Sequence, residues 1–281
     1  MPEADDMLEI NRTYWDAAAE VHGNGDDKTY DLAGLLAGQD TLTAVEDAVL
    51  REATPSVAGL DVLHVQCHIG FETISLARRG ATVTGVDLSP ASLRKAEKLA
   101  TRCGVRPSFV EADANALPEE LWGRFDLAYA SIGVLHFAPD PTVWMRSVAR
   151  CLRPGGRLVL VEYHALPNMF EEFDPARAWC AYDDAGPHDW DGPETGYADP
   201  AQAPAATRVV FCRHGVGAVA TAACRAGLRL LSVGEHTDND RPGEYGSFQE
   251  ADGRWRSRIG GQPVPLLFSI VARRDPDPGP S

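Results

Sequence analysis

Residues 62–88 read VLHVQCHIGFETISLARRGATVTGVDL, the order of a strand, a tight turn, a helix and a second strand that ends in an acid. The first apolar run has the length of a strand, and helical spacing follows at Ile74 and Ala77. Two arginines and Gly80 then end the helix, as cations and glycine commonly do. The pattern predicts a βαβ unit whose turn binds a nucleotide-like ligand, with Asp87 as the acid for ribose hydroxyls.

The composition limits the classes of partner. A chain of 281 residues allows one large α/β domain or two small ones. Its 26 Lys and Arg against 41 Asp and Glu give a formal net charge of −15. Such a charge repels phosphate backbones and anionic membranes, so we expect no nucleic-acid partner. No apolar run approaches the ~20 residues of a membrane span, so we also expect no membrane partner.

The cysteines and the N-terminus indicate the compartment. Six cysteines are scattered without a C-x-x-C motif or a short Cys/His cluster, which predicts free thiols in a reducing cytosol and no metal site. The first residues, MPEADD, lack the basic-then-apolar order of a signal peptide. We therefore expect a cytoplasmic protein.

Strand and helix patterns alternate along the chain, which predicts a parallel sheet with helices on both faces. The last two strands are joined by a connection without a clear helix, which predicts an antiparallel pair at the edge. The fold class is therefore α/β: a Rossmann-like, seven-stranded, mostly parallel sheet. We expect strands over 61–66, 81–86, 107–111, 125–131, 156–163, 228–235 and 264–273, and helices over 8–22, 40–53, 71–79, 90–103, 115–122, 141–152 and 215–226.

A segment rich in Pro, Gly and Asp, 166–207, interrupts this alternation and holds several aromatic residues. A long irregular segment in a compact domain is commonly functional, and the aromatics favour a packed lid. The chain thus divides into a helical cap (1–55), a core (56–165), an inserted lid or substrate region (166–212), a C-terminal helix with antiparallel strands (213–274) and a disordered tail (275–281).

Further signals follow the first unit in order. The segment EADA (111–114) ends the third strand, and FDLAY (125–129) leads into SIGVLH (131–136). A helix end, a turn and the next strand follow as LRPGGRLVLVE (152–162). Together with TGVDLSPASLRKAE (84–97), these motifs resemble the class I S-adenosylmethionine (SAM) methyltransferases, over roughly residues 60–163.

The resemblance implies SAM as cofactor and S-adenosylhomocysteine (SAH) as product, held at the carboxyl ends of the strands. The turn 66–70 would approach the amino-acid tail and ribose, and Asp87 would accept from both ribose hydroxyls. Asp113 would accept from the adenine amino group, while the Ala114 N–H serves a ring nitrogen. The implied cofactor-binding set is Tyr14, Trp15, Gln66, Cys67, His68, Gly70, Asp87, Leu88, Asp113, Ala114, Ser131, Ile132 and Gly133.

The turn departs from the family pattern, which is an acidic residue followed by Gly-x-Gly-x-Gly. His64 stands at the acidic position, Gln66 and His68 replace two glycines, and Gly70 remains. The loop is similar to that of a bacterial subgroup that reads Leu-Gln-Cys-His-Phe-Gly, with an N-terminal Tyr-Trp-Asp and a late Tyr-Ala-Asp. This chain has YWD at 14–16 and YAD at 197–199.

Three residues are candidate catalytic groups. His136 follows the fourth strand, where a methyl acceptor would reach, and histidine has the pKa of a general base. Glu162 and His164 end the fifth strand on one face. Each of the three has an alternative as a hydrogen-bonded structural group. His64 and His214 are interpreted as structural.

Other positions carry alternatives as well. Asp113 either contacts adenine or is a turn residue, and Gln66 and His68 either contact the cofactor or are ordinary loop residues. Tyr14 and Trp15 either pack the first helix on the sheet or form a lid whose aromatic faces shield the sulfonium through cation–π attraction. Asp87 either binds ribose, caps the next helix, or does both.

The predicted function is methyl transfer from SAM to an O, N, S or C nucleophile of a small molecule. The Arg/Ala/Gly/Pro-rich composition is associated with bacterial natural-product tailoring. Three alternatives stay open. The first is an NAD-dependent oxidoreductase, which is typically marked by an intact G-x-G-x-x-G that this chain lacks. The others are a non-catalytic SAM-binding module and an enzyme in which SAM assists a rearrangement or cyclisation. We expect a monomer or homodimer.

Overall fold

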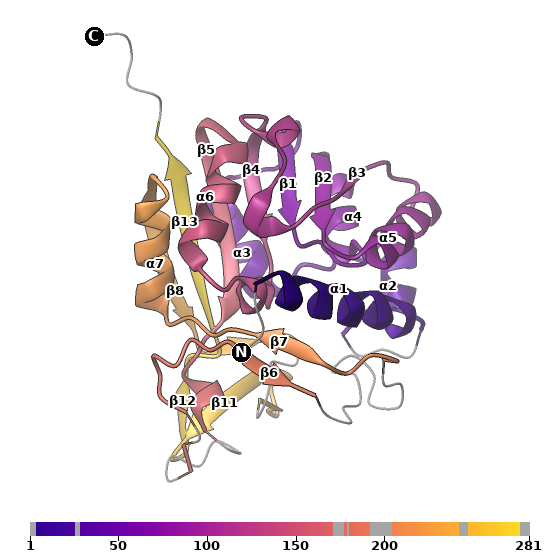
Figure 1. Cartoon of the computed structure of the whole chain (residues 1–281). Coiled ribbons are helices and arrows are strands. Elements are labelled where there is room, and N and C mark those ends of the chain that lie inside the picture. The colour runs from indigo at the N-terminus through magenta and orange to yellow at the C-terminus, as the bar shows by residue number, and fades with distance from the viewer. Residues whose placement is uncertain are drawn as a thin grey trace, which may run out of the picture.

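The computed structural model describes residues 4–25, 29–170, 177–178, 180–191, 204–241 and 247–275. Its main strands are β1 (Asp61–Val65), β2 (Thr82–Asp87), β3 (Ser108–Glu111), β4 (Phe125–Ala130), β5 (Leu152–Tyr163), β8 (Leu228–His236) and β13 (Leu267–Arg274). They form one seven-stranded sheet in the order β3-β2-β1-β4-β5-β13-β8 (Figure 1).

The direction of the strands confirms the predicted fold class. The five strands from β3 to β5 run parallel, with β1 between β2 and β4. β13 is antiparallel to both of its neighbours, β5 and β8, so the late pair lies at one edge of the sheet. Along the chain, β2 and β3 extend the sheet on one side of β1, and β4 and β5 extend it on the other side. The order of the strands thus reverses at β1, and such a switch point is where open α/β sheets bind ligands.

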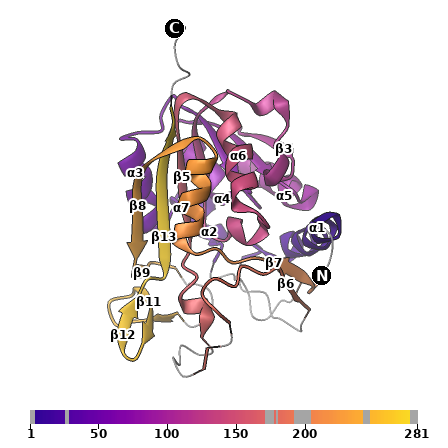
Figure 2. The same cartoon turned by 60° about the vertical axis from the view of Figure 1, so that its left-hand side comes forward.

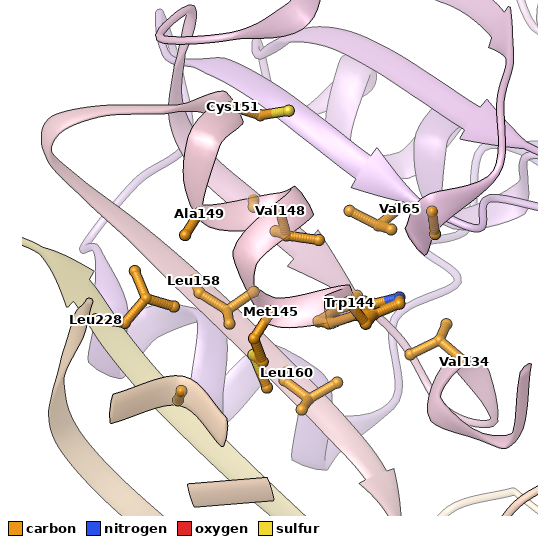
Figure 3. Close-up of a cluster of buried hydrophobic side chains, with 14 of the residues drawn as sticks. Val65, Val134, Trp144, Met145, Val148, Ala149, Cys151, Leu158, Leu160 and Leu228 are labelled. Atoms are coloured by element: carbon orange, nitrogen blue, oxygen red, sulfur yellow. The ribbon is translucent and has the colours of Figure 1, made fainter. Parts of the chain in front are cut away.

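Helices cover both faces of the sheet (Figure 2). On one face, α3 (Ala44–Ala53) and α4 (Phe71–Arg78) pack apolar side chains such as Val49 and Leu76 against the sheet. On the other face lie α6 (Pro141–Cys151) and α7 (Val216–Arg225). Figure 3 shows Trp144, Met145 and Val148 of α6 directed at the central strands. The helix α5 (Pro90–Arg102) joins β2 to β3.

The helix α1 (Ala4–Val21) lies across the carboxyl ends of the parallel strands (Figure 1). Beside it runs a hairpin of β6 (His188–Trp190) and β7 (Val209–Phe211). The side-chain amide of Asn11 on α1 pairs with the backbone of Val210 through two hydrogen bonds, each 2.9 Å. The cap over this edge of the sheet is therefore built from chain segments about 200 residues apart.

Several elements differ from the sequence prediction. The expected helix over 115–122 is wrong: two 3-10 turns, η1 (Ala114–Ala116) and η2 (Glu119–Leu121), take its place. Pro118 lies between them, and proline interrupts a helix. The short helix α2 (Leu32–Ala37) was not expected. The further 3-10 turns are η3 (Val134–Phe137) and η4 (Pro167–Met169).

The connection between β8 and β13 also holds unexpected structure. It forms a small sheet of β9 (Asp238–Asn239), β10 (Phe248–Gln249), β11 (Trp255–Ile259) and β12 (Gln262–Val264). Ion pairs connect parts of this sheet: Arg256 pairs with Asp238, Glu250 and Asp252. Charged pairs rather than an apolar period mark these strands, so hydrophobic patterning did not reveal them.

Three predictions fall wholly or partly outside the described residues: the Tyr-Ala-Asp triplet at 197–199, the tail from 276 onward, and the lid over 166–207, of which 171–176, 179 and 192–203 are not described. The division of the chain into cap, core, lid and C-terminal segments stays a prediction. All six cysteines are free thiols. Among the described helices, none combines the length and apolar character that crossing a membrane requires.

Candidate functional site

The turn between β1 and α4 keeps a glycine-type backbone although it has lost two glycines. Gln66 and His68 have φ values of 56° and 46°, and Gly70 has 78°. The left-handed region costs a residue with a Cβ about 1–2 kcal/mol. At Gly70 a Cβ would lie 2.9 Å from the Cβ of Ala96, so glycine is required there for space as well. The loop conformation is thus retained at Gln66 and His68 against a local strain.

The Gln66 side chain ties this turn to its neighbours. Its Nε2 donates to the carbonyl oxygen of Val134 (3.0 Å), and its Oε1 accepts from the indole of Trp144 (2.8 Å). The amide thereby joins the end of β1 to η3 and α6. Gln66 lies in the predicted cofactor turn, but both polar atoms of its side chain bond to other parts of the protein. Cys67, the next residue, is buried, and its thiol has a raised pKa because of burial and the nearby Asp87.

Asp87 at the end of β2 is the acid of the site. Its side chain is 7 % exposed, and it accepts the backbone N–H groups of His68 (2.8 Å) and Ser89 (2.9 Å). Burial raises the pKa of Asp87 to about 6, and the nearby Asp16 adds to the rise. Two carboxylate oxygens offer about four acceptor positions, so Asp87 retains capacity for two ligand hydroxyls. The helix-cap alternative is wrong, because Ser89 caps α5.

A second acceptor lies at the end of β3. The Oδ1 of Asp113 accepts both the backbone N–H and the side-chain Nδ2 of Asn115, each at 2.9 Å. The Oδ1 of Asn115 is buried and has no hydrogen-bond partner in the part of the chain that the structure describes. Such an orphaned acceptor fits an amino group such as that of adenine. Sequence reasoning missed Asn115, since nothing in its spacing distinguishes it. Ala114 is buried beside it and Leu88 is half-buried.

The loop after β4 is held in place by Glu162. The carboxylate of Glu162 accepts the N–H groups of Gly133 (2.6 Å), Leu135 (2.7 Å) and Tyr163 (2.7 Å). Burial raises the pKa of Glu162, while the nearby His136 and these N–H groups act against the rise. Ser131 and Ile132 are half-buried in the same loop, and Gly133 has a φ of 97°. Glu162 therefore fixes the backbone predicted to meet the methionine portion.

A pocket opens beside this loop and contains two of the three candidate catalytic residues. It is lined by Leu135, His136, Glu162, Tyr163, Ala165, Asn168, Arg213 and His214. The His136 ring stacks on Tyr163, with centroids 6.0 Å apart and planes 13° apart. His214 reaches the carbonyl oxygen of Ala138 through Nε2 (2.7 Å), as its structural interpretation implies.

His164 lies apart from this pocket. Its Nδ1 accepts the Leu166 N–H (3.1 Å), so Nε2 carries the proton and donates to Glu235 (2.9 Å). Burial lowers the pKa of His164, and Glu235 partly offsets this. Both ring nitrogens of His164 are thus engaged: Nδ1 holds the backbone just after β5, and Nε2 links this segment to Glu235 on β8.

His64 also has a structural environment. Its Nδ1 lies 2.7 Å from the Thr73 hydroxyl, and burial lowers its pKa to about 3. A neutral imidazole therefore stands where the resembling family has an acid.

The N-terminal aromatics cover the turn. The Trp15 ring lies 5.0 Å from that of His68 and 5.3 Å from that of Phe137, so it bridges the loops after β1 and β4. Tyr14 meets Trp15 edge-on at 5.4 Å. Asp16 accepts from the Ser89 hydroxyl (2.5 Å) and the Ala91 N–H (3.0 Å). Trp15 thus packs α1 against both loops, and its role as a lid over a bound cofactor stays a prediction.

Comparisons with known proteins agree with this geometry. Residues 63–158 match the family model described as "Methyltransferase domain". The ubiquinone biosynthesis O-methyltransferase of Pseudomonas putida (strain ATCC 700007) is 34% identical over 115 residues, which are 41% of this chain and 49% of that protein. The chain spans about half the length of the curated relatives it matches.

Solved structures match over more of the chain. A SAM-dependent methyltransferase from Mesorhizobium loti superposes with a TM-score of 0.52 at 24% identity, over 85% of this chain and 100% of that one. The [4+2]-cyclase SpnF gives 0.57 at 16% identity, over 98% and 97%. The fold is therefore the Rossmann-like fold of the SAM-dependent methyltransferases. Within it, residues 63–158 are the part that is similar in sequence to a methyltransferase domain.

Proposed function

We propose that this protein is a SAM-dependent methyltransferase that acts on a small molecule. The observation that carries the proposal is the turn 66–70, which holds left-handed backbone at Gln66, His68 and Gly70 and directs the His68 N–H at the buried Asp87. This arrangement lies at the switch point of the sheet, where ligands of open α/β folds bind. The sequence match over 63–158 and the shared fold support it.

The residues at this edge fit the parts of SAM. Asp87 has acceptor capacity for the ribose hydroxyls, and Asn115 offers a buried acceptor for the adenine amino group. Trp15 places an aromatic ring between the two loops, suited to a cation. When bound, SAM supplies an electrophilic methyl carbon. The chain orients donor and acceptor and excludes water from the space between them.

The pocket beside Glu162 is our candidate acceptor site. Of the candidate bases, His136 lines this pocket, and histidine suits proton removal near neutral pH, so it is the residue we assign to that role. Its ring is held by stacking on Tyr163 at the pocket wall. A base is required where the acceptor is a hydroxyl, thiol or acidic carbon. Natural-product tailoring remains our proposal for the biological setting.

The first test is calorimetry with SAH and, separately, with NADH. We expect micromolar SAH binding, no NADH binding, and loss of SAH binding in Asp87→Ala. Asp126→Ala is the matched control. Asp126 lies near the start of β4, at the opposite end of the strands from the site, and pairs with Arg153. Binding of NADH in place of SAH would reject the proposal in favour of the oxidoreductase.

The second test is turnover. Methyl-labelled SAM is incubated with a panel of small phenols, thiols and amines, and labelled products are separated. We expect His136→Ala to keep SAH binding while product formation falls by about 10²–10⁴-fold, the usual contribution of a general base. A protein that binds SAH and converts a substrate without transferring label would instead be a SAM-assisted enzyme.

A further inference from the structure

Trp15 and His22 face the same loop residue. They lie two helical turns apart, so they share one face of α1 and its continuation. The His22 N–H bonds the carbonyl oxygen of Ala18 (2.9 Å), which extends the helical turn past Val21. Ring centroids of Trp15 and His22 lie 5.0 Å and 5.1 Å from that of His68. The side chain of His68 is therefore directed at α1.

A chain of hydrogen bonds passes through this imidazole. The Nδ1 of His22 and the Nε2 of His68 are 2.9 Å apart. On its other side, the Nδ1 of His68 lies 2.9 Å from the hydroxyl of Ser92, in the first turn of α5. His22 is 1 % exposed. One side chain of the turn thus joins the end of α1 to α5.

The surroundings hold this pair in place. Lys95 of α5 donates to the carbonyl oxygens of Ala19 and His22 at the end of α1. The Tyr30 ring stacks on His22, with centroids 5.2 Å apart. Other charged groups near the pair are Asp16 on α1 and Asp87 beneath the turn. Burial lowers the pKa of His68, and the nearby His22 and Lys95 lower it further, so His68 is neutral at neutral pH.

We propose that His68 and His22 are positioning residues of the cofactor turn: their hydrogen bond holds the turn in its left-handed conformation and fixes Trp15 above it. The inference rests on the proposed function, because that function assigns the turn to SAM. A glycine at 68 would adopt this φ without strain. Histidine does not, and its two side-chain bonds offset the strain. The conformation of the turn therefore depends on a side-chain partner from α1.

The test uses His22→Ala, His68→Ala and the double variant, because alanine at 68 keeps the strain of the left-handed backbone while it removes the side-chain bonds. Losing one buried hydrogen bond of about 1 kcal/mol corresponds to a loss of SAH affinity of about five- to tenfold. We expect this loss in His22→Ala and at least this loss in His68→Ala, which also removes the bond to Ser92. Faster amide hydrogen exchange over 12–22 should accompany both. Because either single substitution already breaks the bond between the two rings, the double variant loses no more than the weaker-binding single variant. His236→Ala is the control. It removes one comparable bond, between His236 at the end of β8 and the hydroxyl of Ser269 on β13.

His22→Asn keeps a hydrogen-bonding atom near the position of Nδ1 and is expected to restore affinity to within about threefold of the wild type. If His22→Ala fails to fold, His22→Asn still allows the affinity to be measured with a different side chain at position 22. Wild-type affinity in His68→Ala, unchanged exchange over 12–22 in His22→Ala, or additive losses in the double variant would each overturn the inference. A wild-type protein that does not bind SAH would reject the proposed function instead, while the exchange rates still report on the pair.

Discussion

The indole N–H of Trp144 donates to the side-chain oxygen of Gln66, 2.8 Å away, and so connects the first turn of helix α6 to the turn after β1. Trp144 is fully buried against the central strands (Figure 3). A buried core residue on one face of the sheet is therefore hydrogen-bonded directly to the turn 66–70.

Trp144→Phe keeps an aromatic ring in the core but leaves the Gln66 oxygen without its donor. We expect a loss of about 1–3 kcal/mol in the free energy of unfolding, measured in urea. Trp122→Phe is the control: that indole is 38 % exposed and bonds the Leu117 carbonyl at 3.2 Å, so its loss should stay below about 1 kcal/mol. Equal losses in both variants would show that the Gln66 bond contributes nothing.

Asp87→Asn separates stability from binding. The folded pKa of Asp87 is about 6 against a reference of 3.8, so the unfolded carboxyl ionises first as pH rises. The wild type thus loses about 3 kcal/mol of stability between about pH 4 and pH 6, and the loss persists above pH 6. Asp87→Asn lacks this loss, so its stability relative to wild type should rise over that window while SAH binding disappears.

Urea unfolding at several pH values measures this difference, with Asp126→Asn as the control of opposite sign. Burial opposes ionisation of Asp126, but its bonds to Arg153 and the charge of Arg153 outweigh it and lower the pKa. Its contribution should therefore be present at neutral pH and fade as the solution is acidified. Parallel pH curves for the two variants would contradict the expectation.

Glu162→Gln tests the role of that carboxylate as an anchor. A glutamine offers one oxygen and one NH2 to the three N–H groups that now point at Glu162, so at least one buried donor loses its partner. We expect a loss of about 2–4 kcal/mol in unfolding free energy. Glu235→Gln, on a carboxylate 56% exposed, should cost less than about 1 kcal/mol. If Glu162→Gln is as mild as this control, the loop after β4 has another support.

Gly70→Ala tests the crowding beneath the turn. Both Gly70 and Gly104 have a φ above 70°, so alanine at either position meets the same backbone penalty of about 1–2 kcal/mol. A Cβ at Gly70 would also press on Ala96, whereas a Cβ at Gly104 meets nothing within 4 Å. We therefore expect Gly70→Ala to lower the midpoint of thermal unfolding more than Gly104→Ala. Equal midpoints would mean that α5 yields at Ala96.

Much of this architecture was predictable because it follows from short-range patterns. The apolar runs that became β1, β2 and β4 end in polar turns, and the helices between them carry caps such as Ser89. Asp87 and Asp113 were placed correctly at strand ends for the same reason. Their contacts with a ligand stay predictions.

The partners of the site residues were not predictable. His22 and His68 are 46 residues apart, and Gln66 and Trp144 are 78 apart, with no periodic pattern that relates them. The same holds for Asn115, whose buried oxygen is evident only in three dimensions. His164 was expected to face the acceptor pocket by strand alternation, yet the chain leaves the strand after Tyr163 and its ring turns to Glu235.

The pairing of Asn11 with Val210 has a consequence for biogenesis. The two partners are separated by 199 residues, so at a synthesis rate of about 5–20 residues per second the ribosome needs roughly 10–40 s to deliver the second after the first. During that interval the nascent chain carries its first helix without its later companion. The pairing therefore forms only after most of the chain has been made, and a chain truncated before β7 would leave Asn11 without this partner.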